Sequence, residues 1–162
     1  MGTQRAYIPF MIGCLFAVAW AATSLMEVAA VDVQAKIFWF QIQRLFQIPL
    51  ITATTCFVLE YAWPGRWLSR RNLILLSIPG LLILGFALTN NFHYLLWRGF
   101  EFDSKVLPVR GPANWVFFAY AYGLTIVERI VVGWLFVHSP QHRWVVVVII
   151  IGQVGVRALY IL

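Results

Sequence analysis

Five long apolar stretches follow one another along the chain, separated by short segments rich in polar and charged residues. They cover residues 7–31, 37–63, 73–89, 114–137 and 144–162. A helix needs about 20 predominantly apolar residues to cross the hydrocarbon core of a bilayer, and each stretch reaches or approaches that length. None shows the alternation of apolar and polar positions that is typical of barrel strands. We therefore predict an all-α bundle of about five transmembrane helices.

The connections between these stretches predict an orientation. One side of the bundle carries Arg5, Arg66, Arg70, Arg71 and Arg143, and the other carries Lys36, Arg98, Lys105 and Arg110. Short cytoplasmic loops are enriched in Lys and Arg, and residues 66–71 form the densest basic loop. We expect that loop in the cytoplasm, which places the N-terminus inside and, after five spans, the C-terminus outside. The longest polar segment, residues 90–113, is then a connection on the outer side.

Composition supports lipid as the solvent for most of the chain. Of 162 residues, 62% are hydrophobic and 11% are charged, whereas soluble domains average about 45–50% apolar and about 25% charged residues. The formal net charge is +6, but no soluble basic domain is present, so we expect no nucleic-acid partner. The bilayer is the first partner that the sequence predicts, and residues 1–162 are expected to form one transmembrane domain.

Several polar residues lie inside the predicted spans, where such side chains usually face the bundle interior. Those expected in the outer half of the bilayer form a candidate ligand-binding set: Glu27, Gln41, Arg44, Gln47, Gln153 and Arg157. Gln41, Arg44 and Gln47 recur every three residues and share one side of their helix. Two arginines against one carboxylate leave a surplus of positive charge, which suits an anionic headgroup or a carboxylate-bearing amphiphile. Pairing of Glu27 with an arginine, and snorkelling of the long side chains toward headgroups, are the alternatives.

A second set of ionisable residues is expected in the inner half of the bilayer. Glu128 and Arg129 lie in the fourth span, and Glu60 lies near the cytoplasmic boundary. A charge removed from water needs a partner. We therefore expect Glu60 or Glu128 to pair with Arg129 or with the arginines of residues 66–71.

No residue pattern indicates an enzyme or a bound cofactor. His93, His138 and His142 lie at or near span ends, so a haem held by two histidines inside the membrane is not expected. His138 and His142 lie in a Pro-containing turn, which makes a zinc site equally weak. The chain lacks a nucleotide-binding loop, a Gly-x-Ser-x-Gly elbow and a paired-carboxylate metal motif. We predict no catalytic residue, no metal site and no cofactor.

Motifs from the second span onward resemble a known family of membrane regions. They are Phe38-Trp39, Gln43-x-Leu45, Leu59-Glu60-Tyr61, the run from Arg66 to Arg71, Thr89-Asn90 with His93, Leu96-Trp97, and Gly111-Pro112 with Trp115. In order and spacing they resemble the N-terminal seven-helix membrane region of bacterial histidine kinases, over about residues 19–162. The resemblance implies that the five helices match the family's second to sixth. It also implies positions characteristic of the fold: Trp39, Glu60, Asn90, His93 and Trp97.

The resemblance implies a sensory input module in the inner membrane of a bacterium, without the kinase domain. A small or lipidic ligand in the outer polar set would favour one packing of the helices that Pro49 and Pro79 bend. A missing output domain would then respond to that packing. The alternative is an accessory structural subunit that packs against a larger membrane complex. Both hypotheses predict a protein partner.

Overall fold

Four long helices make up most of the described structure. The computed structural model describes residues 3–67, 69–103, 105–138, 143–144, 147–148 and 151. The helices are α1 (Thr3–Ala29), α2 (Val33–Ala62), α3 (Arg70–Leu88) and α5 (Asn114–His138), and each is long and apolar enough to cross a membrane. They confirm four of the five predicted helices. The fifth, predicted over residues 144–162, lies mostly outside the described residues.

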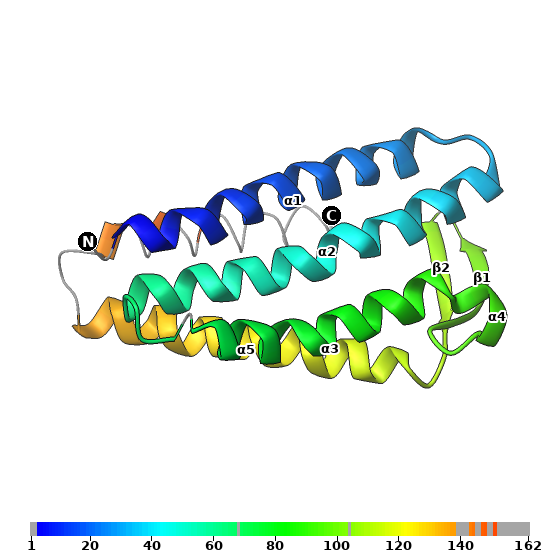
Figure 1. Cartoon of the computed structure of the whole chain (residues 1–162). Coiled ribbons are helices and arrows are strands. Elements are labelled where there is room, and N and C mark those ends of the chain that lie inside the picture. Colours follow the sequence, from blue (N-terminus) through cyan, green and yellow to red (C-terminus); the bar gives the residue numbers. More distant parts are fainter. Residues whose placement is uncertain are drawn as a thin grey trace.

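Successive long helices run in opposite directions along the bundle, with α2 at its centre (Figure 1). Helix α2 contacts α1, α3, α5 and the second strand, and α3 also contacts α5. The loop of residues 63–69 lies at one end, beside the start of α1 and the end of α5; we call this the arginine end. The loop of residues 30–32 and the segment between α3 and α5 lie at the other end, which we call the hairpin end.

Local sequence determines where the helices begin. Asp32 precedes α2 and accepts a hydrogen bond from the backbone N–H of Ala35 at 3.0 Å. Ser69 precedes α3 and accepts one from the N–H of Asn72 at 3.2 Å. Side chains of this kind satisfy backbone donors that have no partner within the helix. Polar residues between the apolar runs thus set the first turn of both helices.

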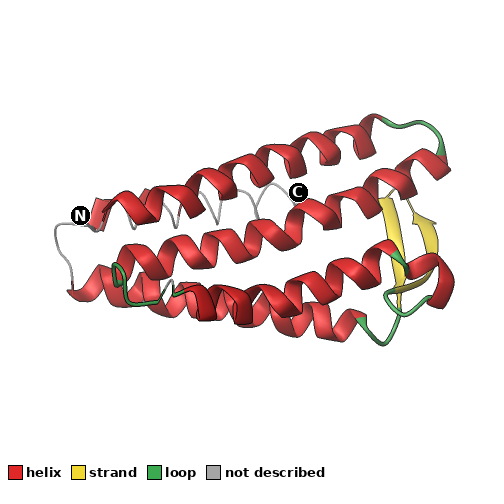
Figure 2. Ribbon diagram, in the orientation of Figure 1, coloured by secondary structure: helices red, strands yellow, loops and turns green. Residues whose placement is uncertain are grey.

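The segment between α3 and α5 corrects the all-α prediction. It forms the short helix α4 (Asn90–His93) and an antiparallel hairpin of β1 (Trp97–Asp103) and β2 (Lys105–Arg110), shown in Figure 2. Trp97 and Val106 are buried, whereas Arg98 and Arg110 are exposed. Buried and exposed residues therefore alternate in part along the strands, but Gly99 and Pro108 interrupt the pattern. For this reason the sequence did not indicate strands here. Proline is tolerated here because both strands of a two-stranded sheet are edges.

Three apolar clusters hold α2 against its neighbours. From the arginine end to the hairpin end, they are Val58 with Val131, Val132 and Leu135; Ile48 with Ile83 and Phe117; and Phe40 with Leu96, Trp97 and Val106. The last cluster packs the hairpin directly onto α2. The position of the hairpin is therefore coupled to the central helix.

Helix α3 lies close to both α2 and α5 at Gly80. A Cβ atom built there would lie 3.0 Å from the hydroxyl of Tyr120 and 3.3 Å from Cγ2 of Ile48. The Tyr120 hydroxyl lies 2.6 Å from the hydroxyl of Thr52 and donates to the carbonyl of Leu76 at 3.2 Å. Tyr120 thus joins three helices at a point where a side chain larger than that of glycine would be tightly packed.

Gly80→Ala is therefore expected to lower the melting temperature in detergent, because the new methyl group displaces the Tyr120 hydroxyl. We expect a cost of about 1–3 kcal/mol, typical of an overpacked core. Gly85→Ala is the control on the same helix, since no atom from another described element lies within 4 Å of its Cβ position. That variant should be neutral or more stable, because alanine favours helix over glycine. Equal melting shifts for both variants would contradict this account.

Candidate ligand site beneath the hairpin

Arg44 lies inside the bundle at the hairpin end, between two aromatic rings. Its guanidinium carbon is 5.0 Å from the ring centre of Phe40 on α2 and 5.2 Å from that of Phe117 on α5. The guanidinium also donates a hydrogen bond to Oε1 of Gln47, one turn further along α2. Contacts between a cation and an aromatic face are attractive and strengthen when water is excluded. Arg44 therefore links α2 to α5 and holds a positive charge, half-buried, between the two helices.

A small cavity lies next to Arg44. Its volume is about 10 Å³, and its walls include Trp97 from the hairpin and Asn114 and Phe117 from α5. Trp97 is 3% exposed and Asn114 is also buried, so the cavity is covered on the hairpin side. This space is enough for about one water molecule. The structure shows the site closed.

Asn90 holds the chain as it enters the hairpin. Its side-chain oxygen accepts hydrogen bonds from the N–H groups of Leu96 at 2.9 Å and Trp97 at 3.1 Å. Its side-chain nitrogen donates to the carbonyl of Trp97 at 3.0 Å. All three residues are buried. One asparagine thus satisfies three backbone groups that have no water nearby.

His93 supports the same turn from the end of α4. Its Nδ1 accepts a hydrogen bond from the N–H of Leu95 at 3.0 Å, and its Nε2 lies 3.0 Å from the hydroxyl of Thr89. Tyr94, between His93 and Leu95, adopts a left-handed backbone conformation with φ of 54°. His93 therefore stabilises a sharp turn and is engaged at both ring nitrogens.

Gly111 closes the base of the hairpin. Its N–H donates to the carbonyl of Leu96 at 2.8 Å, and the N–H of Ala113 donates to the carbonyl of Leu95 at 3.0 Å. A Cβ atom at Gly111 would lie 2.1 Å from the carbonyl oxygen of Leu95. The two ends of the segment therefore meet backbone to backbone, which only glycine permits. Asn90, His93 and Gly111 together position Trp97 over the Arg44 cavity.

The structure brings only part of the predicted ligand set together. Arg44 and Gln47 are in direct contact, whereas Glu27 on α1 accepts a hydrogen bond from Gln43 on α2. Gln41 is half-buried on α2. Gln153 and Arg157 lie outside the described residues. Trp39, a position expected from the resemblance, packs edge-on against Phe38 at 5.4 Å.

The predicted pairing of Glu60 with an arginine is wrong. Its Oε1 accepts a hydrogen bond from the N–H of Gly65 at 2.8 Å, and its Oε2 has no hydrogen-bond partner in the described part of the chain. At Glu128, Oε1 accepts hydrogen bonds from the hydroxyls of Thr54 at 2.7 Å and Thr55 at 2.9 Å. A backbone N–H thus binds the carboxylate of Glu60, and two hydroxyl groups bind that of Glu128.

Sequence reasoning missed the aromatic partners of Arg44. Phe40 precedes Arg44 by four residues, a spacing that brings side chains together on a helix and could have identified it. Phe117 and Asn114 have no such signal, because they belong to a helix that only tertiary packing brings to Arg44. Gln43 was not in the predicted ligand set, although it lies beside its members in the sequence.

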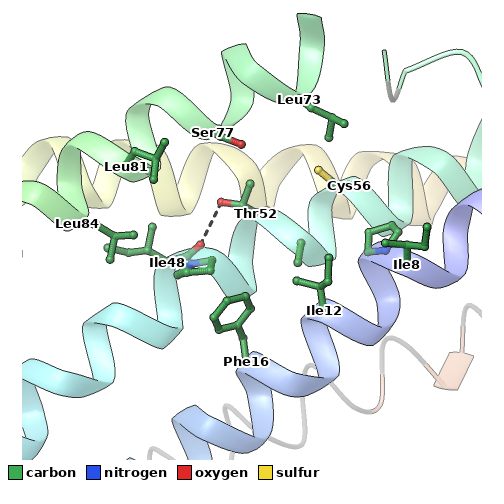
Figure 3. A pocket seen from close by; sticks show the side chains of 14 residues that line it. Ile8, Ile12, Phe16, Ile48, Thr52, Cys56, Leu73, Ser77, Leu81 and Leu84 are labelled. Carbon is green, nitrogen blue, oxygen red and sulfur yellow. Dashed lines mark hydrogen bonds between the residues drawn. The ribbon is translucent and has the colours of Figure 1, made fainter. Parts of the chain in front are cut away.

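A larger groove lies between α1, α2 and α3, with a volume of about 310 Å³ (Figure 3). Most of its walls are apolar side chains such as Ile12, Phe16 and Leu81, and no charged residue is among the described residues that line it. The hydroxyl of Thr52 donates to the carbonyl of Ile48 at 3.1 Å, within its own helix. This groove can hold hydrocarbon but offers no ionic recognition. Arg44 remains the better candidate for selective binding.

Comparison with known proteins identifies the family of the chain. A family model described as the N-terminal 7TM region of histidine kinase matches residues 2–162, which include α1 and exclude any kinase domain. No curated protein and no solved structure matches. The four apolar helices and the family match agree on a multi-pass membrane protein. The chain belongs to the family of N-terminal seven-transmembrane regions of histidine kinases.

Proposed function

We propose that this chain is a sensory input region that binds the anionic group of a small or lipidic ligand at Arg44. The position of the Arg44 guanidinium, inside the bundle between rings of α2 and α5, is the observation that carries the proposal. An ionisable side chain at membrane depth is costly and is commonly functional. The planar guanidinium suits carboxylate and phosphate groups, which it can bind through two parallel hydrogen bonds.

Ligand entry requires the site to open. The cavity beside Arg44 holds about one water molecule, so an anionic group that enters it displaces Trp97 or Phe117. Pairing with the ligand draws Arg44 away from the ring of Phe117 and weakens one link between α2 and α5. A ligand that binds the opened form better shifts the population toward it. Pro49, just beyond Gln47, supplies a point at which α2 can bend.

The packing change is transmitted toward the arginine end, where α5 ends. The cluster of Val58 with Val131, Val132 and Leu135 carries movement of α2 to that end of α5. We place the arginine end in the cytoplasm of a bacterium and the hairpin end outside its inner membrane. The partner that responds is a cytoplasmic output domain, which the histidine-kinase family supports.

Decanoate serves as a probe of this site, with decanol as its uncharged counterpart. In lipid nanodiscs, we expect decanoate but not decanol to change tryptophan emission, because Trp97 covers the cavity. Arg44→Gln should weaken decanoate binding about tenfold or more, since a hydrogen bond to a charged group contributes about 1.5–3 kcal/mol. Trp97→Phe should remove most of the fluorescence response, which identifies Trp97 among the eight tryptophans.

Arg98→Gln is the matched control, because it removes one exposed positive charge from the hairpin itself. If Arg98→Gln and Arg44→Gln weaken decanoate binding equally, the effect is due to net charge alone, and the proposed binding site at Arg44 is wrong. Transmission is measured separately by hydrogen exchange of residues 131–138 with and without decanoate. Binding without any change there would reject the sensory role while leaving the binding site in place.

An accessory structural subunit is the second candidate, supported by exposed apolar side chains at the hairpin end. They include Phe92, Phe102, Leu107 and Trp115. A protein partner docked there would cover them. Cross-linking from the hairpin in native membranes distinguishes the two functions, because a stable complex with a larger membrane protein supports the subunit and its absence supports the sensor.

A further inference from the structure

The arginine end carries an exposed basic patch of Arg66, Arg70 and Arg71. Hydrogen bonds shape the loop that presents it. The N–H of Arg66 donates to the carbonyl of Trp63 at 3.2 Å, and the side-chain nitrogen of Asn72 donates to the carbonyl of Trp67 at 2.9 Å. The loop is thus folded back against the start of α3. Its hydrogen-bonded backbone fixes the positions from which the basic side chains extend.

In the part of the chain that the structure describes, no exposed acidic side chain lies beside this patch, and the nearby Glu60 is buried. The six acidic residues of the chain divide into four toward the hairpin end and two that are buried: Glu27, Asp32, Glu101 and Asp103, then Glu60 and Glu128. Within the described residues, no exposed carboxylate therefore lies at the arginine end. The first turn of α3, which contains Arg70 and Arg71, has no acidic residue either. Basic side chains there add to the positive end of the helix dipole, so an external anion relieves the repulsion.

Aromatic side chains place the patch at the level of lipid headgroups. Trp67 is 47% exposed, and its ring centre lies 6.3 Å from that of Trp63, which lies 5.0 Å from that of Trp134 on α5. Tryptophan is enriched at the boundary between hydrocarbon and water, where its ring meets both. The neighbouring arginines are therefore at the depth of lipid phosphates.

The surface of α3 continues from the basic patch into hydrocarbon. Ile74, Leu75 and Ile78 follow the arginines along α3, and each is about half exposed. A phospholipid meets this surface with its phosphate at the arginines and its acyl chains along these side chains. A soluble anion would contact only the arginines. The arginines and the apolar side of α3 together therefore favour a lipid over a free phosphate compound as the occupant.

We propose that Arg66, Arg70 and Arg71, together with Trp67 and the exposed side of α3, form a binding site for an anionic phospholipid. The lipid phosphate supplies a counter-charge that no exposed carboxylate of the described residues provides at this end. Its occupancy holds the loop between α2 and α3 at the membrane surface. This site is separate from Arg44 and does not depend on the function proposed for it.

The test compares phosphatidylglycerol with phosphatidylcholine, each added to the whole chain in detergent micelles. Bound lipid is counted by native mass spectrometry, and stability is followed by thermal melting. The wild-type chain is expected to retain phosphatidylglycerol preferentially and to melt at a higher temperature with it. Arg70→Gln with Arg71→Gln should reduce that preference about 30-fold, since each basic residue near an anionic lipid contributes about a factor of five.

The matched control is Lys36→Gln with Arg98→Gln, which removes two positive charges from the hairpin end. It should keep the preference, and equal loss in both double variants would overturn the proposal.

Arg70→Lys with Arg71→Lys should retain most of the binding, because the charges remain. Glycerol 3-phosphate at millimolar concentration tests whether a soluble phosphate compound can replace the lipid. If it raises the melting temperature as much as phosphatidylglycerol does, the proposal of a lipid ligand is rejected. If the double glutamine variant does not fold, Arg66→Gln is measured in the same way, and an unchanged preference would reject the site.

Discussion

Gly111→Ala is expected to unfold the hairpin end of the protein. The new Cβ atom would lie 2.1 Å from the carbonyl oxygen of Leu95 and 2.5 Å from its carbonyl carbon, both of which are backbone atoms. They cannot move away without breaking the hydrogen bonds of Gly111 to Leu96 and of Ala113 to Leu95. We expect a cost of about 3 kcal/mol or more, because both overpacking and loss of buried hydrogen bonds contribute. Thermal melting in detergent and the emission of Trp97 measure it.

Gly99→Ala is the control for this prediction. Gly99 belongs to the same hairpin, yet apart from its chain neighbours no described residue has an atom within 4 Å of its Cβ position. It should melt close to the wild-type temperature and leave the environment of Trp97 unchanged. If Gly111→Ala melts as Gly99→Ala does, the close backbone contact at the base of the hairpin does not contribute as described.

Asn90→Ala is the second substitution with a large expected effect. It removes three hydrogen bonds at once and leaves the N–H groups of Leu96 and Trp97 and the carbonyl of Trp97 without a partner. Each buried group left unsatisfied costs about 1–3 kcal/mol, so we expect a loss of about 3 kcal/mol or more. Hydrogen exchange at the amides of Leu96 and Trp97 should accelerate before the rest of the bundle opens.

Two variants control for the loss of a polar side chain. Asn91 is the exposed neighbour of Asn90, so Asn91→Ala should leave exchange at Leu96 and Trp97 unchanged. Asn90→Asp keeps the oxygen acceptor and loses the donor to the Trp97 carbonyl, and its effect should be intermediate. Acceleration of exchange by Asn91→Ala to the same extent would contradict the specific role of Asn90.

The Asn90 prediction also bears on ligand binding. Trp97 covers the cavity beside Arg44, and Asn90 binds the backbone of Trp97. Loss of the Asn90 hydrogen bonds makes Trp97 more mobile and so opens the cavity, while the Arg44 side chain itself is unchanged. Asn90→Ala is therefore expected to speed decanoate binding if the closed hairpin limits access. Unchanged association rates would show that ligands reach Arg44 by another route.

Hydropathy along the chain was enough to predict the four long helices that the structure describes. The positions of α1, α2, α3 and α5 along the chain follow from apolar runs, to within about four residues at each end, because the transfer of each run into lipid depends on its own composition and length. The caps at Asp32 and Ser69 are equally local, since each bonds a backbone group three residues away. The order and spacing of the motifs in the sequence also indicated the family, and the match to the family model confirms that prediction.

Contacts between distant segments required the folded structure. Thr55 and Glu128 are 73 residues apart and are joined by a hydrogen bond, and Arg44 meets Phe117 on another helix. Hydropathy does not specify which faces of two apolar helices meet, because lipid and a neighbouring helix are similarly apolar. Close packing and buried polar contacts select those faces. The hairpin over Arg44 arises in the same way, through the hydrogen bonds of Asn90 and the backbone approach at Gly111.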